Sequence, residues 1–413
     1  MKSLLLALLV LFTSVAGVSA DEVTHWNRVA TDAAAAAQTD PLTESRAFAM
    51  LHVAIHDAVN AVDARYQTYD PVKPAEAGAR PEAAASAAAH DVLVAVFPAA
   101  SAKFDAALAE SLSSMPRDAA TEKGLAAGRA AASATLAARR RDGAERSVAY
   151  APGTKAGQYR PTPPDFTPAW ATQWGGVKPF VLASSSQFRP APPPAVDSES
   201  ARADIAVVRA VGKNEGSTRN EEQSEISRFW YENSTQGWNR IARAVSESRG
   251  LDLHENARLF ALVNLAMADG YVASLEAKYH YAYWRPATAI RNAGDENWLS
   301  DLPTPPIPDY PSGHAMAGAA AATVMERCFG SDFVSFRVTS GAPYPGITRG
   351  FWSFSEAARE NSASRVLAGI HFPTAVAAGY DQGEAVGGWV FAHALRPVGS
   401  DAARIARVDG SRR

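Results

Sequence analysis

Residues 267–291 read MADGYVASLEAKYHYAYWRPATAIR, and this stretch decides how the rest of the chain is interpreted. It belongs to a longer segment with helical periodicity. Lys278 and Arg285 are seven residues apart, or two helical turns, so we expect both to project from one face of a single helix. Pro286 follows and predicts that the helix ends at Arg285. The aromatic residues between the two cations favour a buried pair over a solvated basic face.

A second cluster, PSGH at 311–314, precedes the helix-forming stretch AMAGAAAATVM. Ser312 as an N-cap predicts that a helix begins here, and Gly330 predicts where it ends. The free N–H groups and the positive dipole end of such a helix form an anion site. Gly313 lets the backbone approach the anion, the Ser312 hydroxyl can donate to it, and His314 lies in the first turn. A serine-capped helix with an incidental histidine is the structural alternative.

The third cluster is SRVLAGIH at 364–371. Arg365 lies late in an expected helix that Gly369 terminates, and His371 precedes Pro373, a favoured first helical residue. Within one helix, a separation of six residues would point the two side chains in different directions, so a helix end between them is needed for joint action. A helix N-terminus disfavours charged imidazole, so we expect a neutral His371; a core histidine is the alternative.

Three cations that gather on one site need an anion between them, because like charges at close range repel strongly in a low dielectric. A tetrahedral oxyanion such as phosphate or vanadate would neutralise Lys278, Arg285 and Arg365. The two histidines, His314 and His371, would then supply a proton donor and a nucleophile or ligand.

The three clusters match K-x6-R-P, P-S-G-H and S-R-x5-H in this order, and the chain therefore resembles the phosphatidic acid phosphatase type 2 / vanadium haloperoxidase superfamily. The context at 267–291 and LHVAIHDAVNAVDA at 51–64 resemble its bacterial haloperoxidase branch. The resemblance extends over 25–396 and is weakest at 145–200. It implies an all-α fold made of one or more helical bundles of the vanadium haloperoxidase / acid phosphatase type.

The resemblance also implies roles for individual residues. His371 would be the catalytic group that bonds the oxyanion, as the metal ligand of vanadate or as the nucleophile of a phosphatase. His314 would be the second catalytic group and move a proton. The residues that would bind the cofactor vanadate, or phosphate in its place, are Lys278, Arg285, Ser312, Gly313 and Arg365.

We expect a vanadium-dependent haloperoxidase that oxidises bromide or iodide with hydrogen peroxide. The alternatives are a secreted soluble acid phosphatase, which would cleave a phosphate ester through a phosphohistidine intermediate, and a non-catalytic oxyanion-binding protein. The superfamily commonly has Asp four residues after the nucleophilic histidine; this chain has Ala375, which weakens the phosphatase interpretation more. Leu275 and Ile307 stand where haloperoxidases carry aromatic or histidine groups near the halide, so we expect poor chloride oxidation.

Helical periodicity and proline content divide the chain. The periodicity recurs at 42–64, 82–97, 117–141, 253–284, 314–328 and 374–395. RPTPPDFTP and RPAPPPAV predict an extended connection, because proline cannot continue a helix. We expect an N-terminal helical half at 21–158, a Pro-rich connection at 159–198 and a C-terminal helical half at 199–413 that carries the oxyanion site, all within one fold.

The first 20 residues indicate a secretion signal, with Lys2, the apolar run LLLALLVLF and the small residues VSA. We therefore expect an exported protein, periplasmic or secreted. No later run has 18 uninterrupted apolar residues, so no membrane span is expected in the mature chain. A net charge of −3 gives no reason to expect nucleic acid as a partner, and nothing indicates the oligomeric state.

Two further polar groups stand out. His52 and His56 have a spacing typical of zinc ligands, but no third ligand accompanies them. With Asp57, Asn60 and Asp63 they are better interpreted as a buried hydrogen-bonded network. We expect Asp269 to contact residues that line the oxyanion site, without contacting the oxyanion itself.

Overall fold

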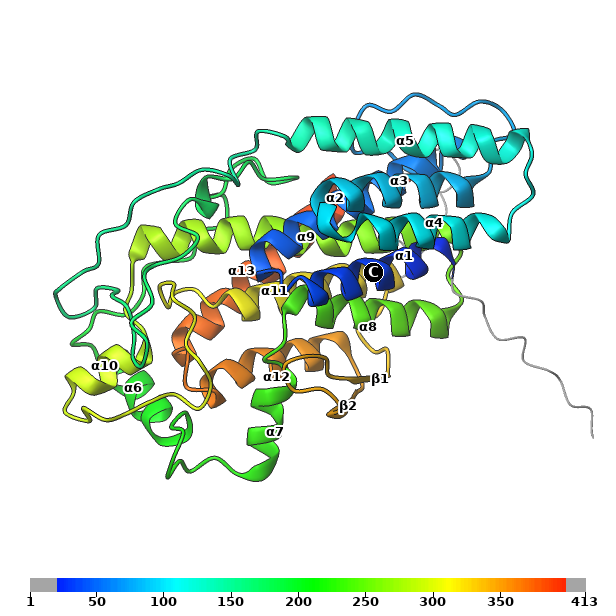
Figure 1. The fold of residues 1–413 in the computed structure, drawn as a ribbon. Coiled ribbons are helices and arrows are strands. Elements are labelled where there is room, and N and C mark those ends of the chain that lie inside the picture. Colours follow the sequence, from blue (N-terminus) through cyan, green and yellow to red (C-terminus); the bar gives the residue numbers. More distant parts are fainter. Residues whose placement is uncertain (1–20, 399–413) are drawn as a thin grey trace, which may run out of the picture.

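The computed structural model describes residues 21–398, so the expected signal at 1–20 lies outside the described residues. The described part is all-α, with thirteen α-helices and one small sheet (Figure 1). The first five helices are α1 (Glu22–Ala36), α2 (Pro41–Val62), α3 (Pro81–Val96), α4 (Ser101–Ser113) and α5 (Ala119–Arg139). The next five are α6 (Glu199–Val211), α7 (Glu221–Phe229), α8 (Ser234–Arg249), α9 (Leu253–Tyr281) and α10 (Pro286–Asn292). The last three are α11 (Gly313–Phe329), α12 (Phe354–Leu367) and α13 (Pro373–His393).

The six ranges with helical periodicity correspond to α2, α3, α5, α9, α11 and α13, which confirms these helix predictions. Side-chain caps explain several boundaries. Asp40 accepts hydrogen bonds from the first backbone amides of α2, and Asp252 with Glu255 forms a capping box at the start of α9. Gly330 ends α11 in the left-handed conformation, with φ of 66°.

The segment between α5 and α6 crosses the surface without an α-helix. It contains only the 3-10 turn η2 (Trp174–Gly176), while a second such turn, η1 (Pro98–Ala100), precedes α4. Asp269 of α9 holds this segment, since its carboxylate accepts hydrogen bonds from the backbone amides of Phe180, Val181 and Leu182. Asp269 therefore fastens the connection, and the expectation that it supports the oxyanion site is wrong.

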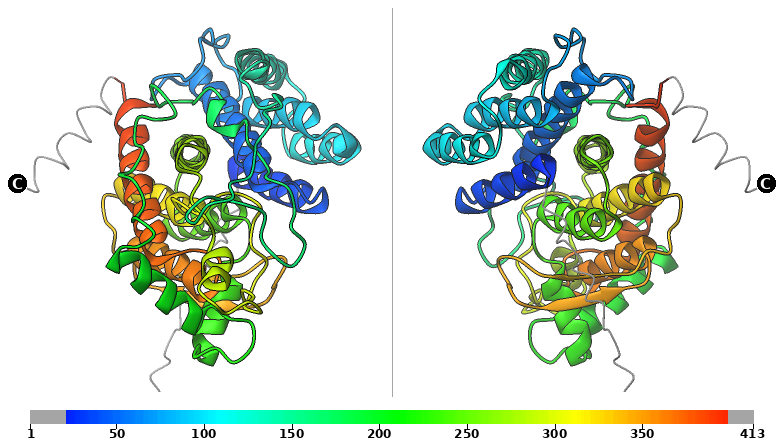
Figure 2. Two further views of the ribbon diagram at one scale, coloured as in Figure 1. Left: turned by 90° about the vertical axis from the view of Figure 1, so that its left-hand side faces the viewer. Right: turned by 90° about the vertical axis from the view of Figure 1, so that its right-hand side faces the viewer.

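Helix α9 is the central element of the fold. It packs against α2 from the first half and against α11 and α13 from the second, and Figure 2 views it nearly end-on with other helices around it. It is long and apolar enough to cross a membrane by length and composition, but 94% of that window is buried inside the protein. Its burial on all sides, rather than on one stripe, explains its weak amphipathicity.

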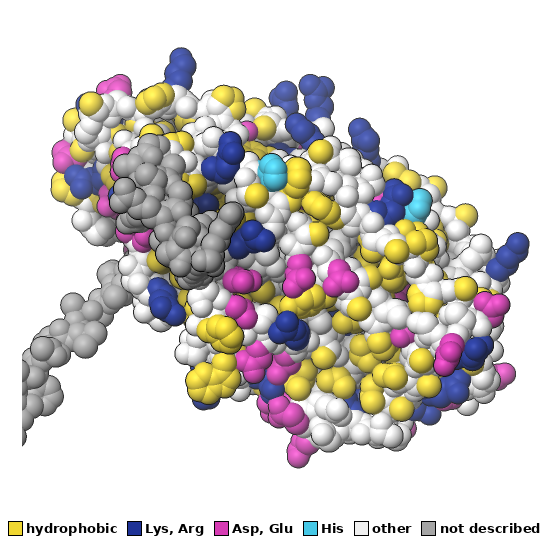
Figure 3. Space-filling view, turned by 180° about the vertical axis from the view of Figure 1, so that it is seen from behind, with side chains coloured by type: hydrophobic (Ala, Val, Ile, Leu, Met, Phe, Trp, Pro, Cys, Tyr) yellow, Lys and Arg dark blue, Asp and Glu magenta, His cyan; other side chains and the backbone are white. Residues whose placement is uncertain are grey.

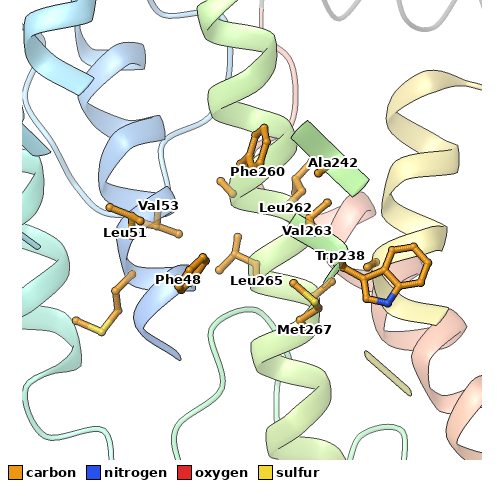
Figure 4. Close-up of a cluster of buried hydrophobic side chains, with 14 of the residues drawn as sticks. Phe48, Leu51, Val53, Trp238, Ala242, Phe260, Leu262, Val263, Leu265 and Met267 are labelled. Atoms are coloured by element: carbon orange, nitrogen blue, oxygen red, sulfur yellow. The ribbon is translucent and has the colours of Figure 1, made fainter. Parts of the chain in front are cut away.

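The core around α9 joins both halves of the chain. Figure 4 shows Phe48 of α2 beside Leu265 of α9, with Trp238 of α8 on another side. The small residue Gly270 lets Met316 of α11 pack directly on the α9 backbone. Apolar burial of this extent across the two halves ties them into one packed unit.

The only sheet in the described residues is a hairpin beside α12. β1 (Phe336–Thr339) pairs antiparallel with β2 (Thr348–Phe351), with Phe336 opposite Phe351. On the opposite face of the molecule, Figure 3 shows basic and acidic side chains interspersed with apolar ones. The hairpin contains none of the residues of the three sequence clusters.

Candidate oxyanion site

Five helix ends meet on one side of the bundle, the left side of Figure 1: the C-termini of α9 and α12 and the N-termini of α10, α11 and α13. Each of the three sequence clusters contributes to this meeting point. Helix N-termini carry partial positive charge and free N–H groups, so their convergence favours a bound anion.

Lys278 and Arg285 do not share one helix, and the prediction that they do is wrong. α9 ends at Tyr281, Ala282 takes the left-handed conformation with φ of 45°, and Arg285 is the N-cap residue of α10. Pro286 is the first residue of the new helix, rather than the stop of the old one. A long-range contact stabilises the break between α9 and α10, because Tyr159 N donates a hydrogen bond to the Ala282 carbonyl.

Lys278 is fully buried in the last turn of α9. Its Nζ donates to the carbonyl oxygens of Pro308 at 2.8 Å and Asp309 at 2.9 Å. Burial and, next, the charge of Arg285 lower the pKa of Lys278 well below its usual range. Lys278 thereby fixes the loop before the PSGH cluster, and a bound anion would favour its charged form.

Arg285 is also fully buried, and its guanidinium spans two loops. Nε donates to the Ile307 carbonyl and Nη1 to the Ile370 carbonyl, each at 2.7 Å. Nη1 also lies 3.1 Å from His371 Nε2. Nη2 is buried without a hydrogen-bond partner. A buried guanidinium nitrogen that lacks an acceptor is costly, and an oxyanion would supply one.

The PSGH cluster begins α11. The predicted start of this helix at Ser312 and its predicted end at Gly330 are both confirmed. Ser312 caps the helix, with its Oγ accepting from Ala315 N at 3.5 Å, so the hydroxyl hydrogen stays available to a ligand. Gly313 is the first helical residue. Ser312 N donates to the Ala375 carbonyl at 2.8 Å, which joins this turn to α13.

His314 is half-buried one residue further along α11. Its Nε2 lies 3.0 Å from the Glu232 carbonyl oxygen, so the ring hydrogen is on Nε2. Desolvation of the ring and then the charge of Arg365 lower the pKa of His314 well below its usual range. A neutral imidazole at this position can exchange a proton with a ligand in the site.

Arg365 lies in the last turn of α12 and is buried. Its Nη1 donates to the Trp230 carbonyl at 3.2 Å, and its guanidinium carbon lies 5.5 Å from the centre of the Tyr231 ring. Nε is buried without a hydrogen-bond partner. Burial lowers the pKa of Arg365 to about 10, so the group stays charged at neutral pH.

His371 follows the end of α12 and precedes Pro373, the first residue of α13, as the sequence predicts. Burial lowers the pKa of His371 well below its usual range, and the charges of Arg285, Lys278 and Arg365 lower it further. All three cations thus act on one neutral imidazole. Their convergence is the arrangement that the three clusters predict.

Asp309 is a member of this site that the sequence interpretation missed. It is fully buried, and its Oδ1 lies 2.9 Å from His371 Nδ1 and 3.8 Å from Arg285 Nη1. The carboxylate is not aligned with the ring as a full hydrogen bond, and no side chain donates to either of its oxygens, although the backbone N–H of Phe372 faces it. Burial raises the pKa of Asp309 to about 7, against the lowering effect of Arg285 and Lys278. The available sequence signal was a carboxylate three residues before Ser312.

The donor set fits a tetrahedral oxyanion. Two buried guanidinium nitrogens, Arg285 Nη2 and Arg365 Nε, have no acceptor, and a neutral His371 lies beside Arg285. No group of three or more His, Cys, Asp or Glu residues suited to a metal cation occurs among residues 21–398. The binding roles of Ser312 and Gly313 stay predictions that their position at the α11 N-terminus supports.

The other histidine pair lies elsewhere and has different partners. His52 contacts Asn27 at 2.7 Å and stacks on Phe260, whereas His56 contacts Asp57 at 2.9 Å. These contacts agree with the predicted buried hydrogen-bonded network, except that Asp63, which the sequence predicts to belong to it, is exposed.

Comparisons with known proteins find similarity over the region that carries the three clusters. A family model described as the VCPO second helical-bundle domain matches residues 258–400, which include all three clusters. Vanadium chloroperoxidase of Curvularia inaequalis is 30% identical over 175 residues, covering 30% of this chain. The match spans 29% of the length of that curated relative.

Solved structures match over most of the chain. A bacterial vanadium-dependent iodoperoxidase superposes with a TM-score of 0.81 at 26% identity, covering 91% of this chain and 96% of that one. An apo-type bacterial vanadium-dependent chloroperoxidase superposes with a TM-score of 0.69 at 18% identity, covering 86% and 94%. The second likeness, at its low identity, concerns the fold alone.

Proposed function

Since this chain belongs to the vanadium haloperoxidase and type 2 phosphatidic acid phosphatase superfamily, we propose that it is a vanadium-dependent haloperoxidase that oxidises bromide or iodide with hydrogen peroxide. The observation that carries the proposal is the pair of unpartnered guanidinium nitrogens, on Arg285 and Arg365, around a neutral His371. Such a set binds a tetrahedral oxyanion and presents a ring nitrogen to it.

Vanadate fits this donor set, and when bound it supplies the activation of hydrogen peroxide toward halide. Lys278, Arg285 and Arg365 would balance its negative charge, with the Ser312 hydroxyl and the Gly313 N–H donating to its oxygens. His371 would be its protein ligand. His314 would hold and transfer the proton that peroxide must lose or gain, after its Nε2–H leaves the Glu232 carbonyl.

The proposed preference for bromide or iodide over chloride rests on the apolar side chains Leu275 and Ile307. Leu275 is buried in the core, and Ile307 is partly buried against it, so neither offers a ring edge or an imidazole to a small anion. Chloride is the hardest of the three halides to oxidise and needs the most strongly polarised peroxide. We therefore propose bromide or iodide as the substrate, with chloride oxidised poorly.

An acid phosphatase is the second candidate, and one observation favours it. Asp309 supplies the carboxylate beside His371 that Ala375 does not, so the objection to a phosphohistidine nucleophile is weaker than the sequence suggested. In this case His371 would attack phosphorus, His314 would protonate the leaving oxygen, and the cations would hold the other oxygens.

The two functions make opposite predictions for one protein preparation, purified without phosphate. A haloperoxidase would brominate or iodinate an acceptor with hydrogen peroxide, and its rate would rise with added vanadate. A phosphatase would hydrolyse a phenyl phosphate ester without vanadium and would be inhibited by vanadate. Ester hydrolysis without any halide oxidation would overturn our choice in favour of the phosphatase.

We also propose that the protein works outside the cytoplasm, on the basis of residues 1–20. Fractionation of cells that express the full chain with a C-terminal tag tests this. The expected result is a tagged product in the exported fraction that is shorter than the full chain by about 20 residues, as the expected cleavage site implies.

A further inference from the structure

We propose that Asp309 is the positioning residue of His371, and that it fixes the tautomer with hydrogen on Nδ1 and the lone pair on Nε2, the nitrogen that Arg285 Nη1 faces. The inference rests on the proposed role of His371 as the group that bonds the oxyanion. It applies equally to vanadate and to phosphate, so it does not depend on which of the two reactions the protein performs.

The polar atoms on the two sides of the imidazole select this tautomer. Arg285 carries only donors, and its Nη1 is nearer to His371 Nε2, at 3.1 Å, than to Nδ1, at 3.4 Å. The ionised Asp309 carboxylate carries only acceptors, and its Oδ1 lies 2.9 Å from Nδ1. A hydrogen on Nε2 would face a donor, whereas a hydrogen on Nδ1 faces an acceptor. Rotation about χ2 of His371, a broad torsion, would align this contact.

Asp309 is held firmly enough to orient a neighbour. Its backbone N–H donates to the Tyr283 carbonyl at 3.0 Å, and its own carbonyl accepts from Lys278 Nζ at 2.9 Å. The side chain is fully buried, no side chain donates a hydrogen bond to it, and the backbone N–H of Phe372 is the donor that lowers its pKa. A buried carboxylate with so few hydrogen-bond donors is costly, so its placement against Nδ1 points to a role beyond stability.

Position 375 is unsuited to that role in this chain. Ala375 is buried in an apolar cluster with Tyr283, Trp284 and Phe372, and its carbonyl accepts from Ser312 N. A carboxylate at 375 would enter this aromatic surrounding, where the cluster offers it little polar compensation. The carboxylate beside the imidazole instead comes from the loop before the PSGH cluster.

The direct test is the ring tautomer of His371 in the protein without any added anion. Proton–nitrogen correlation spectra of protein with 15N-labelled histidine distinguish the protonated from the unprotonated ring nitrogen, and His371→Ala identifies the signal by its loss. The expected wild-type result is hydrogen on Nδ1. Hydrogen on Nε2 in the wild type would overturn the inference without any further variant.

Two substitutions extend the test. In Asp309→Ala the imidazole loses its acceptor, so we expect a mixture of tautomers and at least a tenfold loss of vanadate and phosphate affinity by calorimetry. In Asp309→Asn the carboxamide can donate to Nδ1, so we expect a shift toward hydrogen on Nε2 and a similar loss of affinity. An unchanged tautomer in both variants would overturn the inference.

Asp70→Asn is the matched control, because Asp70 is a buried carboxylate whose partner is Thr135, far from the site in sequence. It should leave the His371 tautomer and the anion affinity unchanged. None of these readouts needs peroxide, halide or a phosphate ester. A wild-type protein with the expected tautomer but without halide oxidation would therefore overturn the proposed function and leave the role of Asp309 intact.

Discussion

Gly379 of α13 packs directly on the backbone of Ser312, so that a Cβ on Gly379 would overlap the Ser312 carbonyl oxygen and lie 3.0 Å from Ser312 N. This contact sets the spacing between α13 and the turn that begins α11. Together with the hydrogen bond from Ser312 N to the Ala375 carbonyl, it places the PSGH turn relative to His371.

The first prediction is that Gly379→Ala separates α13 from the PSGH turn. The added methyl group meets backbone, which cannot rotate away, and overpacking of this kind costs about 1–3 kcal/mol of unfolding free energy. We expect a lower denaturation midpoint and weaker vanadate binding, measured by denaturant unfolding and calorimetry. The control is Gly176→Ala, because a Cβ on Gly176 meets nothing within 4 Å. Equal anion affinity in both variants would contradict the prediction.

The second prediction concerns the two unpartnered guanidinium groups. Arg285→Ala or Arg365→Ala should weaken vanadate and phosphate binding tenfold or more, since a hydrogen bond to a charged group contributes roughly 1.5–3 kcal/mol. Calorimetry measures the loss. Arg337→Ala, on the exposed edge of β1, removes the same charge away from the site and should bind as the wild type does. Unchanged affinity in the two site variants would remove the basis for the oxyanion site.

The third prediction assigns unlike roles to the histidines. His371→Ala should abolish covalent attachment of the protein to phosphorus or vanadium, because it removes the ring nitrogen that the attachment needs. His314→Ala should bind the anion within a few-fold of wild type but lose turnover, because it removes only proton transfer. Binding is followed by calorimetry and turnover by the two assays above. Normal turnover of the His314 variant would show that its role is assigned wrongly.

The fourth prediction is a pH dependence of stability that originates at Glu44 in α2. Burial raises the pKa of Glu44 to about 8 from 4.5, although Gln236 and Asn233 donate to its Oε2. The folded protein therefore keeps this proton between about pH 4.5 and pH 8, whereas the unfolded chain releases it. The resulting stability is fully present below pH 4.5 and is lost as the pH rises through 8.

Glu44→Gln removes this titration with little change of shape. The stability of the Gln variant relative to wild type should rise across the window, by at most roughly 1.4 kcal/mol for each pH unit. Denaturant unfolding of both proteins at several pH values measures the difference. A difference that stays flat from pH 5 to pH 8 is the outcome that contradicts this assignment.

Local sequence predicted the features that depend on neighbours along the chain. Ser312 and Gly330 set the two ends of α11 as predicted, because a cap forms between residues three or four positions apart. Pro373 likewise begins α13. The three clusters also predicted which polar residues gather, since an isolated buried cation is too costly to occur without partners.

Contacts between distant segments decided the rest. The end of α9 at Tyr281 is not visible in the sequence, because the left-handed Ala282 is stabilised from outside by a hydrogen bond from Tyr159 N. Helix propensity acts within about one turn of the chain, and tertiary contacts override it at Ala282. The same limit explains why Asp309 was missed as the partner of His371.

The sequence by itself therefore determined the helical class, most long helices and the set of residues with charge to neutralise. The tertiary structure alone decided how those residues meet: Lys278 and Arg285 from different helices, His314 held by a backbone carbonyl, and Asp309 beside His371. The physical reason is the distance along the chain over which each kind of interaction acts. Caps and periodicity act over one or two turns, whereas desolvation and ion pairing act between any segments that folding brings together.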